Sequence, residues 1–191
     1  IPETSLTSIV WGTASNGHEN GSLNAIEVDG KILIDDDATP PNVPSIASTV
    51  RANPTAGFSI VSYQGNGSTN QTVAHGLNQK PSLIIYKDRD STSNWRVIPA
   101  FINDGHYLEL NSTAAIVTGS TSYFGANTSS VLGISGSNSG IINANNNDII
   151  AYCFAPSEIC SVGKYTGNGS ADGPFVFTGM RPRWIMFKRT D

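Results

Sequence analysis

The side chains that could carry out a reaction are few in this sequence. A glycosidase needs two carboxylates at a fixed separation, and the candidates here are Glu109, Asp104, Asp88 and Asp90. Each lies beside an expected turn or faces outward on an expected strand, where a solvated carboxylate is the usual outcome. The sequence also contains no Gly-x-Ser-x-Gly motif that would mark a serine nucleophile. We therefore expect no catalytic residues and a protein that is not an enzyme.

Metal-binding patterns are equally sparse. The three histidines, His18, His75 and His106, do not share the local spacing of a zinc site. The acidic run at residues 35–37 offers oxygen ligands of the kind that calcium prefers. It does not match the EF-hand pattern, and a solvated linker entrance explains it more simply. We expect no metal and no cofactor.

The two cysteines, Cys153 and Cys160, are too few for a disulfide framework. Cys153 lies in an apolar stretch, where a cysteine behaves as a small buried hydrophobe. A bridge between the two remains an alternative, although nothing in the composition indicates a disulfide-rich protein.

Aromatic residues offer a different chemistry, which is stacking against sugars. Trp95, Tyr107 and Tyr123 lie among polar neighbours and are the candidates for glycan contact. The competing interpretation is that a β-sandwich buries its aromatic residues as core.

The composition excludes several classes of function. Charged residues make up 14% of the 191 residues, the net charge is −4, and Gly, Ser, Thr and Asn are abundant. An acidic chain has no electrostatic attraction to a nucleic-acid backbone. No apolar run approaches the length of a membrane-spanning helix. Few charges and many turn-forming residues favour an all-β protein.

One hexapeptide occurs twice, with a difference at one position. YQGNGS begins at Tyr63 and YTGNGS begins at Tyr165, 102 positions later. The same order of features follows each copy: a second glycine turn, a proline, an apolar run, a lysine and an aspartate. The Asn66-Gly67 and Asn168-Gly169 pairs are typical of tight turns with positive φ. Neither belongs to a phosphate-binding loop, since no Gly-Lys-Ser/Thr follows.

The repeat divides the chain. We expect residues 1–35 to be the end of a preceding β domain, with a hairpin turn at Asp29-Gly30. Residues 36–55 contain four prolines and are predicted to be a linker. Residues 56–156 are the complete repeat, and 157–191 begin a second, truncated one whose strands lack partners. Because a few strands rarely stand alone, we expect the parent protein to continue beyond Asp191.

Strands are predicted in the complete repeat near 57–64, 71–75, 82–87, 95–99, 106–110, 114–118, 130–134 and 148–154. The nearly continuous apolar run DIIAYCF at 148–154 predicts a central strand. The Asn-rich stretch before it is interpreted as surface turns. Short strands punctuated by turns predict an antiparallel β-sandwich or jelly roll.

Several strings together resemble a known family. They are ANPTAGFSIVSYQGNGS, AHGLNQKPSLIIYKDRD, NWRVIP, DIIAYCFAPSE and SVGKYTGNGSADGPFVFTGMRPRWIMFKRTD. In this order, over about residues 52–191, they resemble a domain of unknown function from structural and tail-associated proteins of tailed bacteriophages, especially marine ones. The opening SIVWGTASNGHENGSLNAIEVDGKILID resembles the end of a concanavalin-like jelly-roll domain.

The resemblance implies a virion protein on the exterior of the particle, in a fibre or tail appendage, and it carries over no catalytic residue. We expect self-association, contact with neighbouring virion proteins, and contact with a glycan of the host surface. We expect no nucleic-acid partner and no membrane insertion. The alternatives are a carbohydrate-binding module of an extracellular bacterial multidomain protein and a fragment of a polysaccharide-degrading enzyme.

Overall fold

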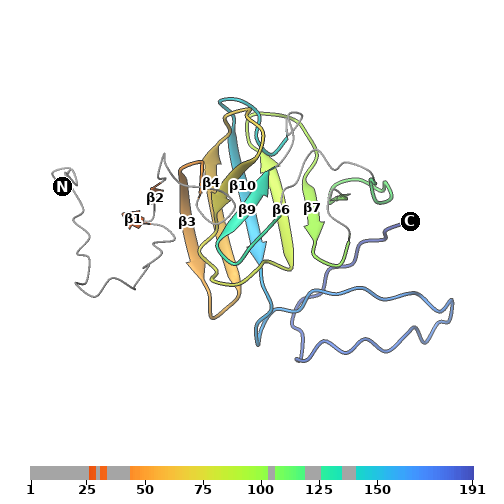
Figure 1. The fold of residues 1–191 in the computed structure, drawn as a ribbon. Helices are drawn as coiled ribbons and strands as arrows, with labels where there is room; N and C mark the ends of the chain where they lie inside the picture. The colour runs from red at the N-terminus through yellow and green to blue at the C-terminus, as the bar shows by residue number, and fades with distance from the viewer. Residues whose placement is uncertain (1–25, 29–30, 34–43, 103–105, 119–125, 135–140) are drawn as a thin grey trace.

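The computed structural model of the chain describes residues 26–28, 31–33, 44–102, 106–118, 126–134 and 141–191. Within these ranges the chain forms strands, turns and irregular segments and no helix. The prediction of an all-β fold is confirmed. Figure 1 shows the strands side by side in one large sheet, with a smaller sheet in front of it.

The strands fall into two antiparallel sheets. The larger has the order β1-β2-β3-β4-β10-β6-β7-β8, and the smaller pairs β5 with β9. The strands of the large sheet are β1 (Ile26–Val28), β2 (Lys31–Leu33), β3 (Ser48–Asn53), β4 (Phe58–Gln64), β6 (Leu83–Asp88), β7 (Arg96–Pro99), β8 (Leu108–Glu109) and β10 (Asp148–Phe154). Those of the small sheet are β5 (Gln71–Ala74) and β9 (Val131–Ile134).

β10 is the central strand of the module, as its apolar sequence predicted. It pairs along its whole length with β4, where Ala151 lies opposite Val61. On its other side it pairs with β6, where Ala151 lies opposite Tyr86. β4 and β6 are therefore joined only through a strand that the chain supplies at the end of the module.

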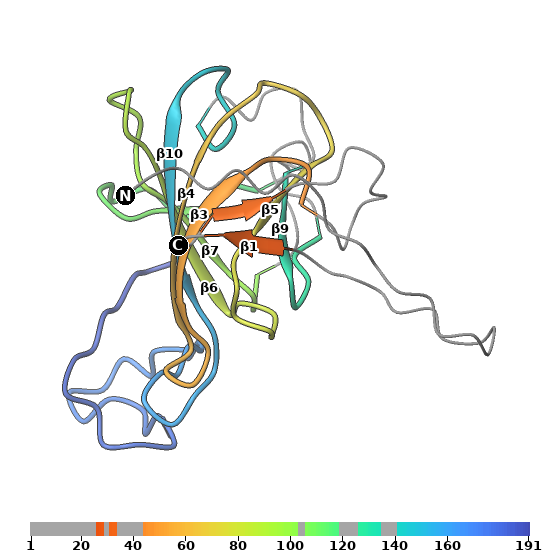
Figure 2. The same cartoon turned by 90° about the vertical axis from the view of Figure 1, so that its left-hand side faces the viewer.

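The core lies between the two sheets. Val61, Tyr86 and Ile149 from the large sheet cluster with Val73 and Leu132 from the small one, and all are almost completely buried. Two packed sheets around one apolar layer form a β-sandwich. Figure 2 shows the small sheet on one side of the large sheet and residues 158–191 looping away on the other.

A second, smaller apolar cluster covers the outer face of the large sheet. Ile85, Val97 and Leu108 are buried there. Half-buried Trp95 and Tyr152 pack on them, with their rings stacked 6.2 Å apart. β6 thus contributes to both clusters, because side chains alternate between the two faces of a strand. Ile84 and Tyr86 face the main core, and Ile85 faces the outer cluster.

Part of the predicted linker at 36–55 is a strand, so that prediction is wrong for Ser48–Asn53. β3 pairs with β4 in register, with Val50 opposite Val61. The strand alternates buried Ser48 and Val50 with exposed Thr49 and Arg51. The nearby prolines outweighed this short alternation in the sequence pattern, although Pro44 and Pro54 only flank the strand and leave its hydrogen bonds intact.

The N-terminal hairpin has the predicted register, with Ile26 opposite Leu33 and Val28 opposite Lys31. In the structure β2 also pairs with β3, so the hairpin extends the edge of the module's own sheet. The turn at Asp29-Gly30 and the run at 35–37 lie outside the described residues, as do His18, Asp104 and Tyr123. The assignment of residues 1–35 to a preceding domain stays a prediction.

Most of the other predicted strands form. β4, β5, β6, β7, β9 and β10 differ from their predicted ranges by at most one residue at either end. The ranges 106–110 and 114–118 shrink to the short strand β8 and a single bridge between Tyr107 and Val117. Both lie at the far edge of the sheet, where a strand has a partner on one side only.

Residues 158–191 form no strand, which corrects the expectation of strands in the second copy. Tyr63 lies on β4 and is 5% exposed, whereas Tyr165 is 51% exposed and has no strand around it. The two tyrosines therefore have unlike surroundings. The topology gives a physical reason, since segments equivalent to β4 and β6 need a strand equivalent to β10 between them.

Candidate functional site

Of the carboxylates considered for a glycosidase, the three that the structure describes, Glu109, Asp88 and Asp90, form structural contacts. Glu109 on β8 forms an ion pair with Arg96 on β7, and the two side chains are 15% and 14% exposed. Asn94 Nδ2 donates a hydrogen bond of 2.7 Å to the other oxygen of Glu109. The Arg96 guanidinium also lies 4.1 Å over the ring of Tyr107. The expectation of a solvated Glu109 is therefore wrong.

Asp88 is likewise buried, against the expectation of a solvated carboxylate. One of its oxygens accepts the backbone N–H of Asp90 at 2.9 Å, and the other accepts Asn147 Nδ2 at 2.8 Å. Asp90 is exposed as expected, and its carboxylate accepts the backbone N–H of Asp148 at 2.6 Å. These carboxylates tie β6 to the start of β10, which is a structural role.

His75 is completely buried at the end of β5. Its Nδ1 accepts the backbone N–H of Leu77 at 3.3 Å, and its Nε2 lies 3.3 Å from the carbonyl of Thr128. Burial lowers the pKa of His75 to about 4, so the ring is neutral at pH 7. Among the described residues, no three His, Cys, Asp or Glu side chains gather as metal ligands.

The two cysteines are free thiols in the structure. Cys153 faces the core from β10 and is completely buried, which confirms its predicted place. Burial raises the pKa of its thiol to about 12. Cys160 is half-buried in the turn after the module.

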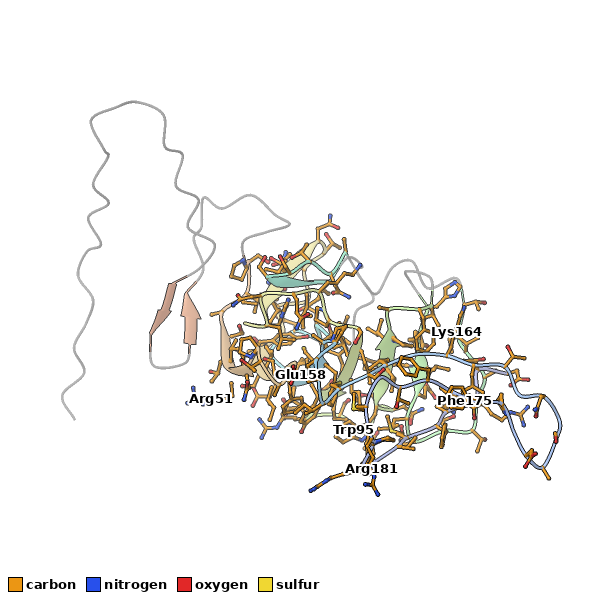
Figure 3. The ribbon with its side chains drawn as sticks, turned by 90° about the horizontal axis from the view of Figure 1, so that it is seen from below. Arg51, Trp95, Glu158, Lys164, Phe175 and Arg181 are labelled. Atoms are coloured by element: carbon orange, nitrogen blue, oxygen red, sulfur yellow. The ribbon has the colours of Figure 1, made fainter. Side chains whose placement is uncertain are left out.

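The three candidate glycan contacts do not form one platform. Tyr107 is 8% exposed and belongs to the main core. Trp95 is half-buried in the cluster on the opposite face of the sheet. Of the two candidates that the structure describes, Trp95 is therefore the more exposed residue. Figure 3 places it on the face along which residues 158–191 run.

The first GNGS turn is a docking point as well as a tight turn. Gly67 has φ = 68°, as predicted for such a turn. Asn143, which is completely buried, donates through Nδ2 to Asn66 Oδ1 at 3.0 Å and to the carbonyl of Ser68 at 2.9 Å. Its Oδ1 accepts the backbone N–H of Asn66 at 2.9 Å. The residues before β10 therefore hold this turn in place.

Asn143 is the residue that the sequence pattern missed, because the Asn-rich stretch around it was interpreted as surface turns. Neighbouring contacts show the same docking. Tyr63 OH donates to the carbonyl of Ile142, and Gly65 N–H donates to the carbonyl of Asn147 at 2.9 Å. A side chain at Gly65 would place its Cβ 2.2 Å from the carbonyl oxygen of Ala144. The signal in the sequence was the pair of apolar residues, Ile141 and Ile142, that leads into the asparagines.

The second GNGS turn has the same local geometry without the docking. Asn168 Oδ1 accepts the N–H of Ser170 at 3.0 Å, as Asn66 Oδ1 accepts the N–H of Ser68 at 3.0 Å. Gly169 has φ = 69°. A Cβ added at Gly167 or Gly169 would meet no atom within 4 Å. The turn is formed by its own residues and stands open.

A shallow groove of about 480 Å³ lies where β3 and β10 begin and β4 ends. Its rim carries the exposed ion pair between Arg89 and Asp148, at 3.7 Å. Among the other lining residues are Ser48, Ser62 and Tyr63. Its lining is mainly polar and contains no cluster of metal ligands among the described residues.

The comparisons with known proteins identify a family and nothing closer. The sequence model of the family described as "Domain of unknown function (DUF7483)" matches residues 34–191. The chain belongs to the DUF7483 family. No curated protein and no solved structure matches the chain.

The DUF7483 match runs through β3, the sandwich module and residues 158–191 without a break. The most unusual surface of this DUF7483 protein is in its last part, which we call the C-terminal segment (residues 158–191). Its large apolar side chains are exposed: Ile159, Tyr165, Phe175, Val176, Phe177, Trp184, Ile185, Met186 and Phe187. Figure 3 labels Phe175 on this segment, where its side chain is 91% exposed.

The C-terminal segment returns to the module at its end. The carbonyl of Thr190 accepts the N–H of Ile116 at 2.9 Å, and Lys188 Nζ donates to the carbonyls of Ser112 and Ala114. Between these anchors and the turn at Ser157, the rings of Tyr165 and Phe187 pack edge to face, with their centroids 6.0 Å apart. Nine large apolar side chains of this DUF7483 protein are thus exposed within 34 residues, and monomeric soluble proteins rarely expose large contiguous apolar patches. In the described part of the chain, no helix is long and apolar enough to cross a membrane.

Proposed function

We propose that the chain is a non-enzymatic structural segment of a bacteriophage virion, in a fibre or tail appendage on the exterior of the particle. The observation that carries the structural part is the exposed apolar C-terminal segment, in which Phe175 is 91% exposed and Trp184 is 74% exposed. Exposing such side chains to water costs about 1.5–3 kcal/mol each relative to burial. A partner that covers them is therefore strongly favoured. The virion context comes from the resemblance of the ordered motifs.

The commitments of the polar side chains support a role without catalysis. Glu109 forms an ion pair with Arg96, and Asp88 accepts a hydrogen bond from Asn147. Both contacts hold the sheet together. The buried histidine is neutral and contacts backbone groups. Rigid β modules in series, each contacting its neighbours, are what a fibre needs.

Assembly is tested by sedimentation velocity of the full chain over a hundredfold range of concentration, with negative-stain electron microscopy of the same samples. We expect elongated oligomers whose population grows with concentration. The triple variant Phe175→Ser, Phe177→Ser and Trp184→Ser should remain monomeric, because it removes much of the exposed apolar surface that a partner would cover. The module should stay folded, because none of the three side chains belongs to its core. The matched control is Thr113→Ala, at an exposed residue outside the segment. A chain that stays monomeric at every concentration overturns the proposal.

A carbohydrate-binding module is the second candidate, and the half-buried ring of Trp95 favours it. An aromatic face with polar neighbours can stack on a sugar, and Asn94 and Asn111 lie beside this one. A glycan array distinguishes the candidates. Binding that is lost in Trp95→Ala and retained in the triple Ser variant supports the module. Absence of binding to any glycan removes this candidate.

A further inference from the structure

The first copy of the repeated sequence is held in place by one later stretch of chain, which we call the closing segment (residues 142–154). Its Asn-rich start binds the GNGS turn through Asn143, and the carbonyl of Ile142 accepts from Tyr63 OH. Its second half is β10, which pairs with β4 on one side and β6 on the other. Without the closing segment, β4 and β6 would each lose a partner along their whole length.

The C-terminal segment contains the counterparts of β4 and β6 and no counterpart of the closing segment. Tyr165 and Val176 correspond to buried Tyr63 and Val73, and Ile185 and Phe187 correspond to Ile84 and Tyr86. The four residues of the first copy are at most 5% exposed, and their four counterparts are at least 45% exposed. The exposed apolar surface is therefore the surface that the closing segment and the small sheet bury in the first copy.

The glycines show the same relationship at atomic detail. In the first copy, Gly65 leaves room for the carbonyl of Ala144, which would lie 2.2 Å from an added Cβ. Its counterpart Gly167 faces open space. Nothing in the described structure requires a glycine there, since no positive φ and no close contact is present. A glycine at 167 fits a close approach of backbone that is not yet made.

We propose that the C-terminal segment is an acceptor for a strand with the chemistry of the closing segment. The occupant is an Asn-rich turn followed by a seven-residue apolar strand of the type Asp148–Phe154. It inserts between residues 160–166 and 184–189 and pairs with both, as β10 pairs with β4 and β6. Addition of a strand to unpaired backbone edges is a recurring mode of peptide recognition.

Two features prepare the segment for this partner. The turn at Asn168 already has the conformation that binds the closing segment in the first copy, so it loses little entropy on binding. The contact between Tyr165 and Phe187 places the counterparts of β4 and β6 near each other. The inference rests on the proposed function only in treating the C-terminal segment as an assembly surface.

The test uses the full chain and a synthetic peptide with the sequence of residues 141–156. Binding is measured by fluorescence anisotropy of the labelled peptide, and the bound region is located by hydrogen–deuterium exchange. We expect saturable 1:1 binding and slower exchange at 160–166 and 184–189. The control peptide carries Ala151→Asp and Cys153→Asp, which place charges on the core face of the strand, and it should bind at least tenfold more weakly.

Two variants of the chain locate the binding site. Gly167→Val should weaken peptide binding at least tenfold, because the side chain would occupy the place of the carbonyl that Gly65 accommodates. Its matched control is Gly163→Val, which introduces the residue found at the corresponding Val61 and meets no atom in the free chain. This control should bind at least as tightly as the wild type. Neither variant touches the folded module, so both should keep its stability.

The inference is overturned if the peptide does not slow exchange in the C-terminal segment, or if Gly167→Val binds as well as the wild type. These failures are distinguishable from failure of the proposed function. A chain that forms elongated oligomers but does not bind the peptide retains the structural role and loses the strand-acceptor mechanism. A chain that binds the peptide but never assembles loses the structural role alone.

Discussion

The side-chain amide of Asn143 is hydrogen-bonded to both the backbone and the side chain of Asn66, which lies 77 residues earlier in the sequence. This contact joins the first turn of the module to the strand that completes it. Asn143→Ala should lower the free energy of unfolding by about 2–4 kcal/mol, since it removes three hydrogen bonds made by a completely buried side chain. Urea denaturation measures it. The control Asn145→Ala, at an exposed neighbour, should change the free energy of unfolding by less than about 0.5 kcal/mol. Equal effects of the two variants would contradict this role of Asn143.

The paired glycines give a second prediction. Gly65→Ala should destabilise the module by about 1–3 kcal/mol, because its Cβ would lie 2.2 Å from the carbonyl oxygen of Ala144. Gly167→Ala, at the corresponding position of the second copy, should leave the melting temperature of the free chain unchanged, because nothing lies within 4 Å. Differential scanning calorimetry of both variants checks the difference. A large loss of stability in Gly167→Ala would mean that the C-terminal segment is already packed.

His75 should make the module sensitive to acid. Burial lowers the pKa of His75 in the folded protein to about 4, from the 6.5 that is usual for histidine. The unfolded state therefore takes up the proton first as pH falls, and stability is lost between pH 6.5 and 4. The loss amounts to about 3 kcal/mol at 1.36 kcal/mol per pKa unit.

The comparison with His75→Gln isolates this effect from the carboxylates, which titrate in the same range. Both proteins are unfolded with urea at several pH values. The wild type should lose about 3 kcal/mol more than the variant between pH 7 and pH 4. Parallel pH profiles would show that His75 is not desolvated.

The two thiols should differ in reactivity. Cys153 is completely buried, and burial raises its pKa to about 12, so its reactive thiolate is almost absent at neutral pH. Cys160 is half-buried and should react with a disulfide reagent in the native protein. Thiol titration at pH 8 should count one group before denaturation and two after it. A rapidly reacting thiol in the Cys160→Ser variant, whose remaining cysteine is Cys153, would place Cys153 outside the core.

Much of the module follows from local sequence patterns. DIIAYCF predicted the bounds of β10 and its central place, and the Asp29-Gly30 pair predicted the register of β1 with β2. Such patterns report which residues are buried along one strand. They do not report which distant strand lies next to it, so the position of β10 between β4 and β6 came only from the structure.

The errors in the sequence interpretation have related causes. Glu109 and Asp88 were expected in solvent, but their partners Arg96 and Asn147 reach them through tertiary contacts that no local pattern records. Asn143 lies in an Asn-rich stretch that is typical of surface turns, yet the GNGS turn covers it completely. The second copy repeats the turn geometry of the first because that geometry is local. It does not repeat the strands, because these depend on a distant partner.

Hydrogen–deuterium exchange of the monomeric full chain, with its monomeric state checked by sedimentation, tests most directly whether the C-terminal segment awaits a partner strand. Amides of β4 and β10 should exchange only through global unfolding, because they are paired within the sandwich. Amides at 160–166 and 184–189 should exchange within seconds, because no strand pairs with them. Protection of residues 160–166 equal to that of β4 in the monomer would contradict the account.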